Sequence, residues 1–420
     1  MTDISFFTKK KCYDNKPPSK IRNNITTMIF ENGEDCLFRL NISRTDKCIG
    51  ILNGMGENGQ QFSRVATEFI LESFRDEWDK LTSLCIENRE EFNKLINNIF
   101  SMTEEYLDIS LGDIGKGGTK VIILCIFRNN DKIYTISINI GDSPCVYIGN
   151  NGEIKHLWED HSPDNIDEYK RYCNKVDKNK RGDFLYSCDN KRINIYDIVN
   201  KNVIVNKENY EELMNSGERI GGSRTIRRNI INENGKVVVH PDSIHKNHNC
   251  TVNGKVSNTR FLGNFKIKRY CNLDSEPSIF IQEVSNNDCL VLGTPHFYNL
   301  LRFESIRNIV ALKIKNNEKS RDICESLFTN MIENAIEEGI KLRNNEYPEW
   351  GDITFSVVVI GSDLTETEYT ESYLNNTINI NTIQKNKMKK INKNARARKR
   401  REARKRRKQR CKNRNPKNKI

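Results

Sequence analysis

The sequence contains no apolar run long enough to cross a membrane, although its 420 residues can bury a substantial core. A membrane-spanning helix needs about 20 consecutive apolar residues, and no stretch approaches that length. The first 20 residues also lack an apolar block of the signal-peptide type and carry the polar cluster Lys9, Lys10 and Lys11. We therefore expect a protein of the nucleus or the cytoplasm, neither secreted nor bound to a membrane.

Cysteine pairs with the spacing of metal or redox motifs are also missing. The thirteen cysteines are scattered without a Cys-x-x-Cys pair, and Cys125, Cys145 and Cys289 lie inside apolar runs typical of strands. An odd, unpatterned set of this kind indicates reduced thiols rather than a disulfide framework. It is typical of an intracellular protein.

Negative charge is nearly absent from one end of the chain. Residues 385–420 contain 20 lysines or arginines and one acid, so this segment carries +19 of the formal net charge and the other 384 residues carry −7. The segment also has no aromatic residue that could stack on a base. We expect a nuclear import signal, an arm that binds nucleic-acid phosphates without sequence preference, or a merely solubilising tail. The central basic positions are Arg396, Arg398, Lys399, Arg400, Arg401, Arg404, Lys405, Arg406, Arg407 and Lys408.

Apolar residues recur at regular spacings between residues 26 and 364, which we expect to form one domain. Helical spacing is found at residues 60–78, 91–107, 167–174 and 319–342. Strand-like runs are found at residues 36–42, 48–52, 119–127, 132–140, 145–148, 279–284, 288–292 and 353–360. Strand pairs joined by short turns, with helix pairs between them, predict an α+β fold of stacked antiparallel sheets with helices outside.

Four other segments lack this periodicity. We expect residues 1–25 to be a loosely ordered polar segment, residues 365–384 an Asn-rich linker, and residues 385–420 the basic tail. Residues 177–249 are polar with short apolar runs, which predicts a long insertion within the domain. Such an insertion either binds a partner, covers a site, or is only a solvated expansion.

Histidines near the end of the predicted insertion invite a metal-site interpretation. His240, His245 and His248 precede Cys250 at a spacing that zinc ligands can have. No Cys-x-x-Cys pair accompanies them. We therefore interpret this cluster as part of a polar loop.

Eight short motifs follow one another through the expected domain. They are Asn-Gly-Glu-Asp at 32–35, Asn-Gly-Met-Gly-Glu at 53–57, Gly-Gly-Thr at 117–119, Ile-Gly-Asp-Ser at 140–143, Asp-His-Ser-Pro at 160–163, Val-Asn-Gly with Arg-Phe-Leu-Gly-Asn within 252–264, Glu-Pro at 276–277 and Gly-Asp-Ile-Thr at 351–354. In this order they resemble the motifs of the type 2C (PPM-type, metal-dependent) Ser/Thr protein phosphatases. The resemblance covers roughly residues 30–362 and implies a β-sandwich of antiparallel sheets flanked by helix pairs, in α-β-β-α layers.

The resemblance also implies a two-metal centre at one edge of the sheets. Residues 50–57 and 288–299 each predict a buried strand that runs into a tight turn, where the family presents carboxylates to Mg²⁺ or Mn²⁺. Asn53 stands where the family has the aspartate that bridges the two ions, and Gly54 stands where a glycine lends its carbonyl oxygen. Met55 replaces the histidine thought to protonate the leaving alcohol.

The other implied ligand positions have also lost most of their acids. Pro295, Asn299 and Gly351 stand where the family has aspartates, and Asp352 lies beside the last of them. A phosphate-binding arginine of the family is replaced by Phe30. The acids that remain at family positions are Glu34, Asp35 and Asp142.

These losses predict a pseudophosphatase. Mg²⁺ and Mn²⁺ prefer hard, mostly anionic oxygen ligands, and two close dications repel unless carboxylates bridge them. We therefore expect an inactive relative that needs no metal cofactor and binds proteins, phosphoproteins among them. One alternative is a weakly active Mg²⁺- or Mn²⁺-dependent phosphatase with a rearranged site of Glu34, Asp35, Asp142 and Asp352. Another is a nucleic-acid-associated structural protein that works through its basic tail.

Overall fold

The computed structural model describes part of the chain. The described residues are 3–8, 19–22, 25–43, 45–113, 116–188, 191–194, 230–233, 236–239, 250–337, 342–343, 347–348 and 353–361. The chain divides into two units, residues 1–367 and 368–420, and every described residue belongs to the first. The predicted linker and basic tail therefore lie outside the described residues. Among the helices of the described stretches, none has the length and apolar character to cross a bilayer.

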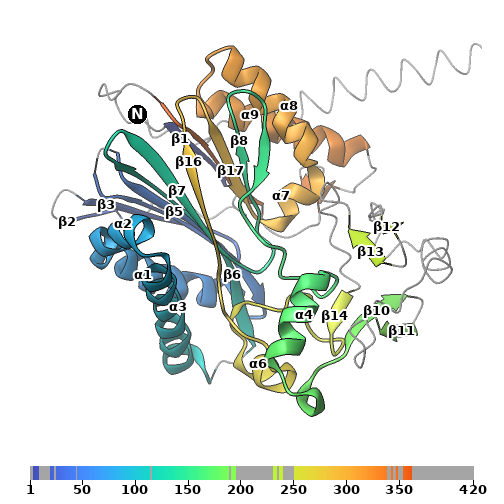
Figure 1. The fold of residues 1–420 in the computed structure, drawn as a ribbon. Helices are drawn as coiled ribbons and strands as arrows, with labels where there is room; N and C mark the ends of the chain where they lie inside the picture. The colour runs from blue at the N-terminus through green and yellow to red at the C-terminus, as the bar shows by residue number, and fades with distance from the viewer. Residues whose placement is uncertain are drawn as a thin grey trace, which may run out of the picture. The chain divides into compact units, whose positions relative to one another are not determined.

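Two antiparallel sheets form the centre of the first unit (Figure 1). The larger sheet has the strand order β16 (Ser278–Val284), β7 (Lys132–Ile140), β6 (Gly117–Asn129), β5 (Lys47–Gly56), β4 (Asp35–Asn41), β3 (Ile25–Asn32) and β2 (Ser19–Arg22), and β15 (Leu262–Gly263) also pairs with β6. The smaller sheet has the order β1 (Asp3–Thr8), β20 (Thr354–Val359), β17 (Cys289–Gly293), β8 (Cys145–Ile148) and β9 (Ile154–His156). Neighbouring strands run antiparallel throughout both sheets, as predicted.

Alternate residues of the facing strands fill the space between the two sheets. This core contains Leu37, Ile49, Ile51, Ile122, Leu124 and Ile126 from the larger sheet and Cys145, Tyr147, Leu290, Leu292 and Val358 from the smaller one. Side chains alternate between the two faces of a strand, so residues two positions along from this core face the same side. At one end of the core these residues are Asp35 on β4, Asn53 on β5 and Lys120 on β6.

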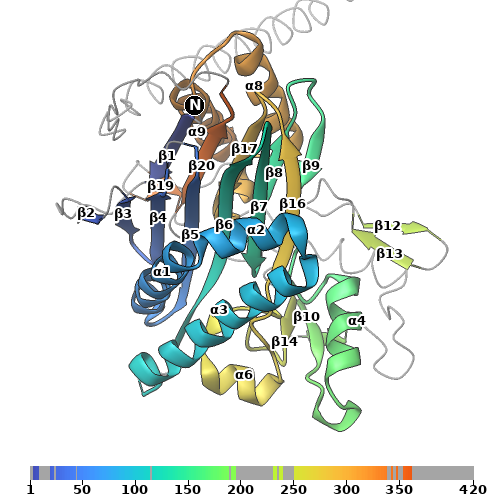
Figure 2. The ribbon, with the colours of Figure 1, turned by 60° about the vertical axis from the view of Figure 1, so that its left-hand side comes forward.

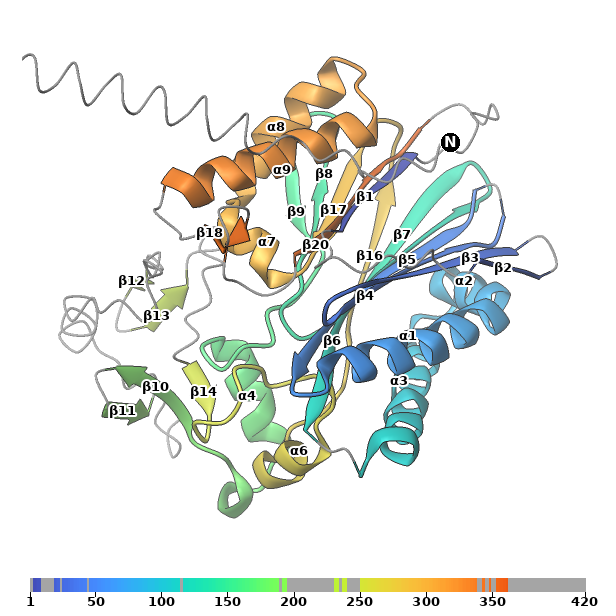
Figure 3. The same ribbon diagram turned by 180° about the vertical axis from the view of Figure 1, so that it is seen from behind.

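Helices cover the outer faces of the sandwich. On the larger sheet, α1 (Gly59–Asp76), α2 (Trp78–Glu87) and α3 (Arg89–Leu111) bury their apolar residues against the outward side chains of the strands (Figure 2). On the smaller sheet, α8 (Phe303–Lys315) lies beside β8, and α9 (Ser320–Glu337) packs against β1 and β20 (Figure 3). The order of layers is helix, sheet, sheet, helix, and the predicted α+β sandwich is confirmed.

A separate apolar cluster joins elements from two distant parts of the sequence. It includes α4 (Ile166–Lys175), α6 (Phe265–Cys271), β10 (Phe184–Cys188) and β14 (Cys250–Val252). The rings of Tyr169 and Phe184 meet edge to face within it, with centroids 5.1 Å apart. Met55, at the end of β5, packs against this cluster.

Three predicted features differ from the structure. The strand predicted at 48–52 continues to Gly56, because β6 pairs with β5 along its whole length, so the expected turn is displaced. After β17 the chain enters a helix, α7 (Pro295–Leu300), rather than a tight turn, since proline suits the first turn of a helix. Within residues 1–25, expected to be loosely ordered, residues 3–8 form β1, which pairs along its length with the distant β20, and residues 19–22 form β2, which pairs with β3.

The structure describes only short pieces of the predicted insertion at 177–249. These are η1 (Lys178–Lys180), β10, β11 (Lys191–Asn194), β12 (Ile230–Glu233) and β13 (Lys236–Val239) with a few adjoining residues. His240, His245 and His248 lie outside the described residues. Cys250 is buried on β14, within the apolar cluster of α4 and α6. The role of the insertion stays a prediction.

Candidate functional site

Three polar side chains line up on neighbouring strands of the larger sheet. Asp35 on β4 lies directly opposite Asn53 on β5, and Asn53 lies directly opposite Lys120 on β6. Directly opposed residues of antiparallel strands point to the same face, with Cβ atoms about 4.5–5.5 Å apart. The three side chains therefore meet beside one another at the edge of the core between the sheets.

Asp35 is buried, and each of its carboxylate oxygens accepts a hydrogen bond. Asn53 Nδ2 donates to Asp35 Oδ1 over 2.6 Å. Thr354 Oγ1, at the start of β20 in the other sheet, donates to Asp35 Oδ2 over 2.7 Å. Because an ionised carboxylate only accepts hydrogen bonds, Asn53 turns its amide NH₂ group, and not its carbonyl oxygen, toward Asp35.

Lys120 forms an ion pair with Asp142, which lies in the turn after β7. Lys120 Nζ is 3.1 Å from Asp142 Oδ1, and only 1% of the Asp142 side chain is exposed. Burial lowers the pKa of Lys120 to about 8, against the opposing effect of the Asp35 and Asp160 carboxylates. The contact with Asp142 and the nearby carboxylates of Asp35 and Asp160 all favour the ammonium form of Lys120.

Gly141 provides the space that this lysine needs. Its φ of 97° lies in the left-handed region, which side chains rarely adopt. A Cβ atom at position 141 would lie 2.8 Å from both Cβ and Cγ of Lys120. The turn can carry Asp142 to the lysine because residue 141 has no side chain.

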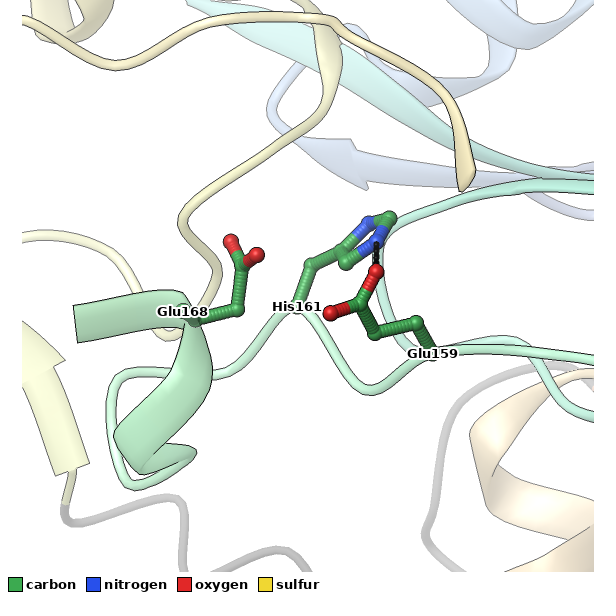
Figure 4. Close-up of side chains that lie close together, drawn as sticks. All are labelled: Glu159, His161 and Glu168. Carbon is green, nitrogen blue, oxygen red and sulfur yellow. Dashed lines mark ion pairs between the residues drawn. The ribbon is translucent and has the colours of Figure 1, made fainter. Parts of the chain in front are cut away.

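A second cluster contains Glu159, His161 and Glu168 (Figure 4). Their potential ligand atoms lie within 4.8 Å of one another, close enough for a metal ion. However, His161 Nδ1 accepts the backbone N–H of Gly141 over 2.9 Å, and His161 Nε2 lies 2.9 Å from Ser278 Oγ. Burial lowers the pKa of His161, although the hydrogen bond to Glu159 opposes this. A neutral His161 therefore carries its hydrogen on Nε2 and has no ring nitrogen left for a metal.

Arg260 compensates the negative charge of this second cluster. Arg260 Nε donates to Glu168 Oε2 over 3.0 Å, and Arg260 Nη2 donates to the other oxygen of the same carboxylate. Burial raises the pKa of Glu168, but the hydrogen bond from Arg260 and the positive charge around it bring that pKa down to about 2. The cluster is therefore a neutralised ionic network that supports the Gly141 turn, and a metal would have to displace an arginine.

One family model matches the chain over residues 45–179 and 228–340, and it describes protein phosphatase 2C. These ranges together cover more than half of the 420 residues. The chain belongs to the protein phosphatase 2C family. The match passes over residues 180–227, which lie within the predicted insertion.

Solved structures of other proteins are similar to this chain at low sequence identity. Serine-threonine phosphatase 2C from Toxoplasma gondii is 11% identical with a TM-score of 0.49, and the match covers 85% of this chain and 98% of that one. The serine/threonine phosphatase Stp1 from Staphylococcus aureus is 13% identical with a TM-score of 0.46, and the match covers 86% of this chain and 96% of that one. A sex determining protein from C. elegans is 13% identical with a TM-score of 0.46, and the match covers 86% of this chain and 64% of that one. The search of curated protein sequences finds no match, so the assignment rests on the family model.

Gly54 and Met55 follow Asn53 on β5, and both pack closely against neighbouring parts of the chain. The Gly54 backbone N–H donates to the Glu34 carbonyl over 3.1 Å, and a Cβ at Gly54 would lie 2.4 Å from that oxygen. The Glu34 side chain itself is exposed. Met55, in place of the family's histidine, contacts the apolar cluster that contains Tyr169 and Tyr172. Its side chain supplies packing and has no acidic proton to donate.

The later 2C family positions are only partly described. Pro295 is buried as the first residue of α7, and its side chain has no atom that could bind a metal. Asn299 lies within the same helix. Gly351 and Asp352 lie outside the described residues, so the structure does not bring them to the site.

The described residues do not fit the pair of Mg²⁺ or Mn²⁺ ions that the 2C family requires. Asp35 and Asp142 are the buried acids among the described family positions, and both already have partners that donate hydrogen or carry positive charge. Hard dications need several anionic oxygens, and a close pair of them needs bridging carboxylates. Here an amide donor and an ammonium group face those carboxylates instead.

Sequence reasoning missed Lys120, Asp160 and Thr354 as members of this site. For Lys120 a signal was present. It lies two residues before Ile122 and four before Leu124, so the alternation of the strand places a lysine on the core-facing side. A lysine is almost never buried without a charged partner, so a core-facing lysine at this position predicts that acidic side chains lie near it.

Proposed function

We propose that this member of the protein phosphatase 2C family is a pseudophosphatase that acts by binding other proteins. The observation that carries the proposal is the 2.6 Å hydrogen bond from Asn53 Nδ2 to Asp35 Oδ1. At the position where the resemblance implies a bridging carboxylate, this chain has a hydrogen-bond donor. The donor also engages one of the few acids that remain.

The chemistry expected of the family depends on what such a metal pair supplies. Bound dications lower the pKa of water to give hydroxide near neutral pH and neutralise the phosphoryl group during attack. Without them, none of the described side chains at Asp35, Asn53 and Lys120 offers an activated nucleophile. Met55 has no proton for the leaving alcohol. We infer that the fold is kept for recognition, with phosphoproteins among the candidate partners.

A phosphatase assay tests this proposal. A phosphoserine or phosphothreonine peptide is incubated with the full-length chain in millimolar Mn²⁺ or Mg²⁺, beside an active family member. We expect release of phosphate no faster than without protein. Metal-dependent turnover that disappears in both Asp35→Ala and Asp142→Asn variants would support instead the weakly active phosphatase with a rearranged site.

A role in nucleic-acid binding or nuclear import remains a proposal based on the tail alone. Its support is the +19 formal charge of residues 385–420, which lie outside the described residues. We expect the protein in the nucleus rather than the cytoplasm only if this segment acts as an import signal. The pseudophosphatase proposal does not depend on it.

A further inference from the structure

We propose that Lys120 is the resident cation of this site, and that its fixed positive charge keeps divalent ions out even where acidic ligands are restored. This inference rests on the proposed function, because both require that the natural chain binds no divalent metal. It adds a specific reason why a divalent metal does not bind, namely the charge of Lys120. In this inference the missing ligands and Lys120 act together to exclude a divalent metal.

The lysine is built into the site rather than placed near it by chance. Its backbone position is fixed opposite Asn53 by the pairing of β5 with β6. Its side chain is 13% exposed and ends 3.1 Å from Asp142 Oδ1. Gly141 leaves the space that its Cβ and Cγ occupy. Strand register, the ion pair and the glycine turn therefore all direct the ammonium group to the same place.

The surrounding charge explains why a cation belongs there. Asp142 contacts the ammonium group directly, and the carboxylates of Asp35 and Asp160 act on it electrostatically. Buried carboxylates brought together without a cation would repel one another. In an active relative the resemblance implies that metal ions supply that positive charge. In this chain an amino-acid side chain supplies it.

The same charge opposes a metal ion at the carboxylates that the lysine compensates. Repulsion between two positive unit charges about 4 Å apart near a protein surface weakens the binding of a monovalent cation on the order of 100-fold or more. For a divalent cation the repulsion energy is twice as large. Restoring an aspartate at position 53 would place a new carboxylate beside Lys120. The new group would pair with the ammonium group before it could serve a metal.

The test compares Mn²⁺ binding by four full-length proteins. These are the natural chain, Asn53→Asp, Lys120→Met and the double variant, each titrated calorimetrically and by thermal shift in millimolar Mn²⁺. We expect binding at least tenfold tighter in the double variant than in either single variant. If Asn53→Asp alone binds Mn²⁺ as tightly as the double variant, or if the folded double variant binds none, the inference is wrong.

Lys116→Met is the matched control for loss of a lysine. Lys116 lies just before β6, is 66% exposed and pairs with the exposed Glu57. Its substitution by methionine therefore removes one positive charge, as Lys120→Met does, but at a position outside the site. We expect Lys120→Met to lower the melting temperature clearly more than Lys116→Met does. Adding Asp142→Asn to Lys120→Met should recover part of that loss, because it removes the buried carboxylate whose ion pair with Lys120 was broken.

If the double variant with Asn53→Asp and Lys120→Met does not fold, the comparison of melting temperatures still tests whether Lys120 is the counter-ion of the site. Equal effects of Lys120→Met and Lys116→Met, or no recovery on adding Asp142→Asn, would contradict the role of Lys120 as counter-ion. Failure of the proposed function gives a different result. In that case the natural chain itself would hydrolyse the phosphopeptide in Mn²⁺, whereas failure of this inference alone leaves it inert.

Discussion

His161 Nδ1 accepts the backbone N–H of Gly141 over 2.9 Å, and this bond ties the imidazole to the turn that carries Asp142. On its other side the ring reaches Ser278 Oγ over 2.9 Å. The histidine is fully buried, so bulk solvent does not reach these contacts. The His161 ring therefore links the Gly141 turn to the ionic network of Glu159, Glu168 and Arg260, beside the hydrogen bonds that Gly141 O accepts from Asn139 Nδ2 and from the His161 backbone N–H.

The first prediction concerns this hydrogen bond. His161→Ala leaves the buried Gly141 N–H without its acceptor, which should cost about 2–4 kcal/mol of unfolding free energy with the cavity included. His161→Asn keeps an acceptor oxygen close to the position of Nδ1 and should cost clearly less. Urea unfolding of the three proteins measures the difference. Equal losses in both variants would show that the bond to Gly141 contributes little.

The second prediction concerns the pH dependence of Glu168. Its pKa falls from 4.5 to about 2 in the folded chain, so its stabilising contribution is complete above about pH 4.5 and is lost as the pH falls toward 2. A pKa difference of this size corresponds to roughly 3 kcal/mol. We expect Glu168→Gln to be less stable than the natural chain at pH 6, and the gap to narrow steadily between pH 5 and pH 3. A gap that stays constant across that range would contradict the ion pairs of Glu168 with Arg260 and Arg171.

The third prediction separates backbone strain from contact with Lys120. Gly141→Ala and Gly152→Ala both place a methyl group on a residue with positive φ, 97° and 82°. Nothing lies within 4 Å of the methyl position at Gly152, whereas Lys120 lies 2.8 Å away at Gly141. We expect a loss of about 1 kcal/mol for Gly152→Ala and about 2–4 kcal/mol for Gly141→Ala. Thermal or urea unfolding measures both, and similar losses would show that the lysine stem does not fill this space.

The fourth prediction concerns the basic tail. Deletion of the residues after Gln384 removes a net charge of +19 and should weaken low-salt binding to DNA and RNA by more than 100-fold. Binding by the full-length chain should fall steeply with added salt and show no sequence preference, because contacts from lysine and arginine to phosphates are electrostatic and carry no sequence information. Fluorescence anisotropy with two unrelated oligonucleotides measures this. Unchanged affinity in the deletion variant would exclude the tail as a nucleic-acid arm.

Local periodicity was enough to predict much of the sandwich. The helical spacing at 60–78 and 91–107 corresponds to α1 and α3, and the alternation at 132–140 corresponds to β7. The helix α2 was missed, because the sequence continues from α1 without a glycine or proline and the break at Glu77 is only a change of backbone angles. The helix α8 was missed too, although Ile306, Val310 and Ile314 have helical spacing.

The site depends on long-range pairing that no local pattern contains. Asp35, Asn53 and Lys120 become neighbours only through the register of three strands, and Thr354 reaches Asp35 from the other sheet. The resemblance supplied the positions of Asp35 and Asn53 but not the direction of the Asn53 amide. That direction follows from its carboxylate neighbour, which accepts and cannot donate.

Whether this chain binds divalent metal at all is tested by a calorimetric titration of the natural, full-length protein with Mn²⁺ near neutral pH. An active protein phosphatase 2C serves as the positive control under the same conditions. We expect no saturable heat and no rise in melting temperature for this chain. Saturable binding of two ions that is abolished by Asp35→Ala would contradict it.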